Sequence, residues 1–338
     1  MPIDKQWLAQ TTEETIEPEL RICDPHHHLW DHPGSRYLLE ELLEDTGSGH
    51  NIVSTVFVEC LSEYRKDSTP AMAPVGETDF VQAIADASSP VGNGKNEETQ
   101  VAAAIVGFAD LLLGKAVDDV LAAHKEASPN RFCGIRHACS WDASDEVRNS
   151  HTKPPPQLYL NEEFRKGFAR LANHDLTFDT WLYHTQLDEL LSLARDFPGQ
   201  AIVLDHVGGP LGIGPYKGKR CEIFEIWQDR INQLAKCENI LVKLGGLAMA
   251  INGFEWNKRE LPPSSEELAE ATKPYILHCI EQFGPQRCMF ESNFPVDKVS
   301  CSYNVLWNSF KRITSEFSAD EKNALFHGTA TKFYSIND

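Results

Sequence analysis

The sequence predicts an α/β fold in which eight parallel strands close into a single-domain (β/α)₈ barrel with long loops after the strands. Three observations predict it. Eight short apolar runs recur along the chain, amphipathic helical patterns separate them, and no stretch of linker composition divides the 338 residues into two domains. We assign residues 1–19 to an N-terminal extension and residues 20–338 to the barrel.

The strands are expected where the runs are apolar on both faces, because helices cover both sides of a parallel sheet. In chain order the runs are Leu20–Cys23, Ile52–Cys60, Val101–Phe108, Phe132–Cys139, Leu176–Leu182, Ala201–Leu204, Ile240–Leu244 and Arg287–Phe290. An open, doubly wound sheet is the alternative arrangement of the same elements.

The helices are expected where apolar residues recur at helical spacing between two strands. A capping box of Ser264 and Glu267, preceded by two prolines, marks the start of one of them. The expected helices are Tyr37–Glu44, Thr78–Ala87, Ala116–Ala127, Asn161–Asn173, Leu187–Phe197, Glu222–Cys237, Ser264–Phe283, Ser302–Phe317 and Asp320–Phe333.

Two connections are longer than ordinary loops, namely Leu61–Thr78 and Ala248–Pro263, and Lys153–Pro156 marks a further excursion. In a barrel these segments follow the carboxyl ends of strands, where the loops build the active site. We therefore expect the site at that end of the molecule.

Composition excludes several classes of protein. The 31 basic and 50 acidic residues give a net charge of −19, which argues against binding to nucleic acid or anionic membranes. No run of 18 apolar residues exists, and the N-terminus lacks a basic start and an apolar stretch, so neither a membrane span nor a signal peptide is expected. The nine cysteines form no CxxC pair, which favours a reducing, cytoplasmic location.

The strongest chemical signal is the segment Asp24-Pro-His-His-His28 at the end of the first strand. Residues two apart on a strand share a face, so His26 and His28 should enter the barrel mouth while His27 points outward. Two imidazoles on one face suit a first-row metal ion. The alternative is a pair of structural histidines near a turn.

Five motifs together resemble the amidohydrolase-related barrel hydrolases, in particular the branch with sugar-lactone hydrolases and pyrone-dicarboxylate lactonase. They are Asp24–Asp31 (DPHHHLWD), Gly134–Arg136 (GIR), Leu204–Gly208 (LDHVG), Val242–Gly246 (VKLGG, for the family's VKLSG) and Cys288–Pro295 (CMFESNFP, for the family's MFGSD-[WF]-P). The resemblance covers about residues 20–335 and implies a hydrolase barrel, but it does not specify a substrate.

Further histidines are expected at strand ends. His206 ends the sixth strand, and Asp205 should face the other way. His184 follows the fifth strand, where the wider superfamily carries a metal-binding histidine, and only one of Tyr183 and His184 can enter the barrel. The candidate ligands of one divalent metal, zinc or manganese, are His26, His28, His184 and His206. A metal-free site remains open, since the pyrone-dicarboxylate branch is implied to work without a metal.

Other strand-end residues are candidates for binding substrate. The planar fork of Arg136 suits a carboxylate or a lactone carbonyl, and Glu59 could be a base, a ligand or the partner of Arg136. Lys243 could hold an anionic group or be paired. The full substrate-binding set that we expect is Arg136, Glu59, Trp30, Tyr183, His184 and Lys243.

Asn293 stands where the family typically has aspartate, and an amide cannot take a proton near neutral pH. Three consequences are possible. Glu59, Glu291 or Asp297 could supply the missing carboxylate, a histidine could be the base, or hydrolysis could be lost. Glu291 lies two residues before Asn293, which predicts the same strand face one layer deeper.

The function we expect is hydrolysis of a lactone or related cyclic ester or amide of a small polar or carboxylated molecule. His206 would transfer the proton, His26 and His28 would hold metal or carbonyl, and Asn293 would orient water or substrate. The alternatives are a metal-dependent decarboxylase of an aromatic or unsaturated acid and a non-catalytic binding barrel. No nucleotide cofactor is expected, because Gly208–Gly214 lacks the strand–GxGxxG–helix context. The protein should be a monomer or homodimer that binds a small molecule.

Overall fold

The computed structural model describes residues 3–88 and 99–337. Eight parallel strands form one sheet in chain order: β1 (Arg21–His27), β4 (Asn51–Val58), β5 (Gln100–Gly107), β6 (Phe132–Arg136), β7 (Thr177–Thr180), β8 (Ile202–Leu204), β9 (Ile240–Leu244) and β10 (Cys288–Phe290). The segment after β10 pairs with β1, because Asn293 N donates to His26 O (2.9 Å) and His28 N donates to Phe294 O (2.8 Å). These bonds close the sheet, which confirms the (β/α)₈ barrel.

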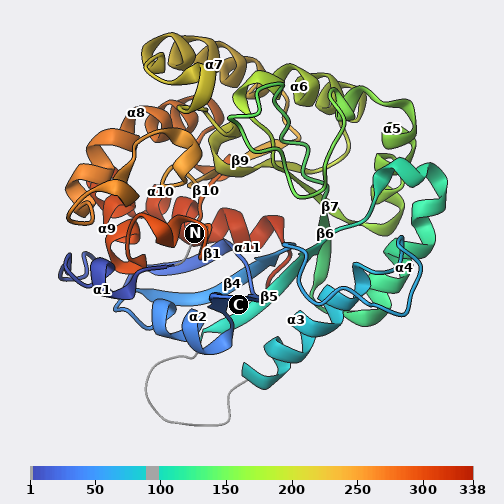
Figure 1. Cartoon of the computed structure of the whole chain (residues 1–338), viewed down its shortest axis with the longest axis horizontal. Helices are drawn as coiled ribbons and strands as arrows, with labels where there is room; N and C mark the ends of the chain where they lie inside the picture. The colour runs from blue at the N-terminus through green and yellow to red at the C-terminus, as the bar shows by residue number, and fades with distance from the viewer. Residues whose placement is uncertain (1–2, 89–98, 338) are drawn as a thin grey trace.

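Helices surround the strands, and Figure 1 shows the ring that α3 to α9 form outside the barrel. The α-helices are α1 (Lys5–Leu8), α2 (Leu39–Thr46), α3 (Val75–Ser88), α4 (Val117–Ala127), α5 (Glu162–Phe168), α6 (Leu187–Asp196), α7 (Arg220–Leu234), α8 (Ser265–Phe283), α9 (Tyr303–Ile313), α10 (Ala319–Asn323) and α11 (Thr329–Phe333). Across the described ranges, no helix has the length and apolar composition needed to cross a membrane.

Several element boundaries differ from the sequence prediction. The first strand continues to His27 instead of ending at Cys23, and its register against β4 shifts between Asp24 and His27. The expected helix Asn161–Asn173 ends at Phe168, and a 3₁₀ turn follows it. The last predicted helix is divided by a π-helical turn, Ala324–Gly328. A short hairpin, β2 (Trp30–His32) with β3 (Ser35–Tyr37), was not predicted.

Most of the apolar core lies in two parts, and a small third cluster packs Val147, Tyr183 and Leu211 together. The larger part fills the space between strands and helices, as both faces of a parallel sheet require. The smaller part lies inside the barrel, where alternating residues such as Val56 and Val58 of β4 meet Ala330 and Tyr334 at the C-terminal end of the chain. Helix α11 therefore packs against the barrel interior, and Figure 1 shows it across the strands β1 and β10.

The N-terminal segment is held against α8 and α9 by polar contacts. Glu13 accepts hydrogen bonds from Ser265 N (2.7 Å) and Asn308 Nδ2 (3.1 Å). The Lys311 ammonium donates to the carbonyl oxygens of Ile16 and Glu17, each over 2.9 Å. This segment thus packs on the helical layer and leaves the barrel mouth to the loops.

Candidate active site

The centre of the site is a carboxylate that bridges two imidazoles. Glu291 follows β10 and is fully buried. Its Oε1 lies 2.6 Å from Nδ1 of His206 and 2.9 Å from the backbone N of the same residue. Its Oε2 lies 2.8 Å from Nδ1 of His26. The two rings are 4.6 Å apart, so Glu291 fixes both of them in one small cluster.

The backbone after β8 brings two consecutive side chains into the barrel. The strand ends at Leu204, and Asp205–Gly208 form a tight turn in which His206 has a φ of 54°. Asp205 therefore faces the interior together with His206, which corrects the expectation that it would face the other way. Gly246, with a φ of 65°, leaves the space for this turn, because a Cβ there would overlap the His206 ring.

Buried charges continue from the imidazoles across the barrel. The Lys243 ammonium lies 2.6 Å from Asp179 Oδ2, 3.1 Å from Asp205 Oδ1 and 3.2 Å from His26 Nδ1. Arg136 donates through Nε to Glu59 Oε1 (2.7 Å) and through Nη2 to the Glu59 carbonyl oxygen (2.5 Å). Arg136 and Glu59 therefore form the ion pair that the sequence analysis gave as one alternative for these two residues. Charges that are this deeply buried persist only when they are paired.

The protonation states follow from burial and neighbours. Burial, and then the charge of Lys243, lower the pKa of His26 well below 6.5, so this imidazole is neutral. Burial works to raise the pKa of Glu291, but His206 and His26 outweigh it and lower that pKa to about 2. Likewise, His151 and Arg136 overcome burial and lower the pKa of Glu59 to about 2. Both glutamates are therefore carboxylates at neutral pH.

His28 and Trp30 lie at the edge of the cluster. His28 Nδ1 lies 2.7 Å from the Val58 carbonyl oxygen, which requires a proton on that nitrogen, and the His28 ring stacks on Trp30 at 5.8 Å. His27 points away from the interior and bonds to Thr55 Oγ1 (2.9 Å). His26 and His28 thus share a face, as the spacing indicated.

Asn293 lies at the mouth but does not join the imidazole cluster through its side chain. Its backbone has a φ of 54°, and its Nδ2 donates to Asp297 Oδ1 over 3.0 Å. Strand β10 ends at Phe290, so Glu291 and Asn293 lie in the irregular segment that follows the strand.

The structure separates His184 and Tyr183 from the cluster. His184 Nδ1 accepts from Leu211 N (3.3 Å), and its ring packs edge-on against Tyr216. Tyr183 donates its hydroxyl to the Arg148 carbonyl and packs against Trp181. Trp181 in turn lies edge-on to His206 at 4.7 Å, so it contacts the cluster directly, whereas Tyr183 contacts it through this tryptophan.

A loop after β6 covers the mouth. Its His151 Nε2 lies 2.8 Å from Glu59 Oε2, on the carboxylate that also holds Arg136. The side chain of His151 is 23% exposed, whereas His206 is 3% exposed. The cluster is therefore almost closed to solvent. Sequence reasoning gave no signal for His151, because the residue lies in an irregular loop.

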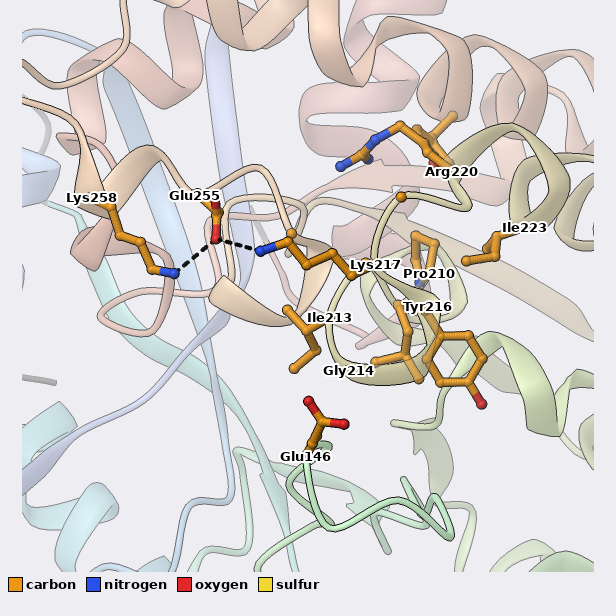
Figure 2. A pocket seen from close by; sticks show the side chains of 15 residues that line it. Glu146, Pro210, Ile213, Gly214, Tyr216, Lys217, Arg220, Ile223, Glu255 and Lys258 are labelled. Atoms are coloured by element: carbon orange, nitrogen blue, oxygen red, sulfur yellow. Dashed lines mark hydrogen bonds and ion pairs between the residues drawn. The ribbon is translucent and has the colours of Figure 1, made fainter.

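A cavity of about 560 Å³ lies at the rim, beside the cluster and apart from it. Figure 2 shows its walls, which come from the loops after β6, β8 and β9 and from the start of α7, and Tyr275 of α8 also lines it. Glu255 pairs with Lys258 (2.8 Å) and Lys217 (3.8 Å) across this opening. None of the residues that line it belongs to the imidazole cluster.

Three potential metal ligands, His26, Asp205 and His206, have donor atoms within 4.8 Å of one another. Their surroundings do not suit a metal ion. His26 has Glu291 at one ring nitrogen and Arg136 Nη1 (3.3 Å) at the other. Asp205 lies within 3.5 Å of two permanent cations, Lys243 and Arg136, which would repel a dication at the same place. The arrangement fits a site without metal.

Comparison with known proteins agrees with this fold. A family model described as Amidohydrolase matches residues 23–336, so the chain belongs to the amidohydrolase family and is a hydrolase. An uncharacterized protein of Sinorhizobium fredii is 33% identical and covers 94% of this chain and 99% of its own length. An L-fucono-1,5-lactonase of Burkholderia multivorans is 25% identical, with coverage of 94% and 96%. A solved Burkholderia multivorans amidohydrolase with bound zinc has a TM-score of 0.71 at 21% identity, covering 94% and 99%.

Proposed function

We propose that this hydrolase opens a lactone by adding water to the ring carbonyl, without a metal ion. The single observation that carries the proposal is the state of His206. Its Nδ1 donates to Glu291, and in the described part of the chain no side chain or backbone group bonds to its Nε2. A neutral imidazole held this way has one free lone pair, which is what a general base needs.

The reaction would proceed in two steps. Nε2 of His206 takes a proton from water while the water oxygen attacks the carbonyl carbon, which gives a tetrahedral oxyanion. The oxyanion then collapses, the bond to the ring oxygen breaks, and His206 returns its proton to that oxygen. The product is a hydroxy acid, so one water is consumed and no other reactant is needed.

The neighbouring residues stabilise the charges that develop. Glu291 faces the imidazolium that forms on His206, over 2.6 Å. Arg136 and Lys243 lie within 3.3 Å of His26, so two cations stand beside the imidazole pair and favour negative charge on the substrate oxygen. Trp181 lies edge-on to His206 and borders the cluster with an aromatic ring, against which a substrate ring can pack, whereas Trp30 is stacked on His28 and His32.

The L-fucono-1,5-lactonase relative supports a lactone as the class of substrate. A substrate screen identifies the particular lactone. Purified protein is mixed with sugar 1,5-lactones, sugar 1,4-lactones and a pyrone dicarboxylate, and acid release is followed with a pH indicator. We expect turnover of at least one lactone. Release of carbon dioxide from an aromatic acid would favour the decarboxylase instead, and tight binding without turnover would favour a binding barrel.

A further inference from the structure

We infer that Glu291 is the positioning residue of this site, which fixes the tautomer of His206 and lies against Nδ1 of His26, and that Gly245 is the residue that admits it. The inference deepens the proposed lactone hydrolysis, on which it rests for its kinetic arm. Different neighbours determine which ring nitrogen carries the proton in the two imidazoles.

His26 is determined by Arg136. The Arg136 Nη1 group lies 3.3 Å from Nε2 of His26, and a guanidinium can only donate. Nε2 must therefore accept, which leaves the proton of this neutral ring on Nδ1. Oε2 of Glu291 lies 2.8 Å from this nitrogen. Lys243 also lies 3.2 Å from Nδ1, but its shorter contact is with Asp179 at 2.6 Å.

His206 is determined by Glu291 alone. Oε1 of Glu291 lies 2.6 Å from Nδ1 and accepts the backbone N–H of the same residue as well. The carboxylate cannot donate, so Nδ1 of His206 carries a proton and Nε2 carries the lone pair. This carboxylate thus sets the tautomer of His206, and it leaves Nε2 of His206 free to act on a substrate.

The space for this carboxylate comes from Gly245 at the end of β9. A Cβ on Gly245 would overlap Cγ of Glu291 and its carbonyl oxygen. Both β9 and β10 end here, and their last residues pair in register, Leu244 with Phe290. Any side chain at position 245 would therefore push Glu291 away from the imidazoles.

The sequence motifs agree with the idea that a glycine at position 245 makes room for a glutamate at position 291. The chain has Gly245 where the family pattern has serine, Glu291 where the pattern has glycine, and Asn293 where the pattern has aspartate. The carboxylate of this chain thus stands two residues before the family's aspartate position. The neighbouring residue, Gly245, has only a hydrogen atom as its side chain.

The test uses the variant Glu291→Gln in the full-length protein. A glutamine offers one acceptor and one donor, and its amide group would face a ring nitrogen that already carries a proton. Long-range ¹H–¹⁵N NMR of histidine-labelled protein reads the tautomer directly. We expect His206 to be protonated on Nδ1 in the wild type and to leave that state in the variant. Unchanged tautomers in Glu291→Gln would overturn the inference.

Two further variants keep the test sharp. Glu77→Gln alters another buried carboxyl group, one that accepts from the backbone of Cys60 and Ser62, and it should leave the tautomers unchanged. Gly245→Ala should reproduce the tautomer change with residue 291 intact. If Gly245→Ala folds and retains the wild-type tautomers, Gly245 does not admit Glu291 and that part fails.

The kinetic arm applies once a lactone substrate is in hand. Glu291→Gln should lower kcat on the order of 10²-fold or more, with KM changed less than about threefold, because the base is misplaced while the binding surface stays. The losses in Gly245→Ala and Glu291→Gln should be less than multiplicative in the double variant. Fully multiplicative losses would contradict the coupling. Since the NMR readout needs no substrate, failure of the lactonase proposal remains distinguishable from failure of this one.

Discussion

The Asn293 amide donates to the Asp297 carboxyl over 3.0 Å, and the other Asp297 oxygen accepts from Ala248 N over 3.1 Å. Both bonds favour an ionised Asp297, yet burial prevails and raises the pKa of this carboxyl to about 7. The carboxyl group nearest to Asn293 therefore titrates in the range where the enzyme would work.

This pairing predicts a pH-dependent stability. In the unfolded chain Asp297 ionises near pH 4, whereas in the folded protein it keeps its proton until about pH 7. Wild-type stability should fall as pH rises between these values. In Asp297→Asn that loss is absent, so the stability of the variant relative to wild type should improve by about 2–3 kcal/mol between pH 5 and pH 8. Urea unfolding at the two pH values measures it. The exposed Asp320→Asn is the control, and an equal change in both variants would refute the assignment.

The free Nε2 of His206 predicts the effect of removing the base. His206→Gln should lower kcat on a lactone substrate by a factor on the order of 10²–10⁴, with little change in unfolding free energy. Steady-state kinetics and urea unfolding provide the two readouts. His184→Gln is the matched control, because that imidazole is buried outside the cluster. Equal losses in the two variants would show that His206 has no special role.

The cations around Asp205 predict independence from metal. Protein purified without added metal and treated with a chelator should keep its lactonase activity, and elemental analysis should find less than about 0.1 equivalent of zinc or manganese. One equivalent of either metal, lost in His26→Ala together with activity, would show that Lys243 and Arg136 tolerate a dication beside them.

The contact of Tyr334 with Asp179 predicts a role for the C-terminal end. The Tyr334 hydroxyl donates to Asp179 Oδ2 (2.6 Å), the oxygen that also binds Lys243. Tyr334→Phe removes one donor from a buried carboxylate and should lower the free energy of unfolding by about 1–3 kcal/mol. Thermal and urea unfolding measure the change. Tyr216→Phe, in the rim loop, should cost less, and the reverse order would argue against a buried role for Tyr334.

Much of the fold could be predicted from the sequence, because the alternation of apolar runs and amphipathic segments reflects burial directly. The site could be predicted only in part. Residues two apart share a face on any strand, so the placement of His26 and His28 on one face could be predicted from their spacing. The predicted direction of the Asp205 side chain was wrong, because His206 adopts a positive φ that its residue type does not predict. Glu291 was one of three candidate carboxylates, and only the backbone turn after β10 shows that it reaches both imidazoles.

The charge network has a consequence for how the protein can assemble. Its members come from β1, β6, β7 and β9 and from the turns after β4, β8 and β10, and the contacts of Asp205 with Arg136 and of Glu291 with His26 join the two halves of the chain. A barrel that lacks one or two strands would hold lysine, arginine or carboxylates without partners in an apolar interior. Partial barrels are thereby penalised relative to both the closed and the unfolded chain. Folding should be all-or-none, and separately expressed halves should acquire structure only when they associate.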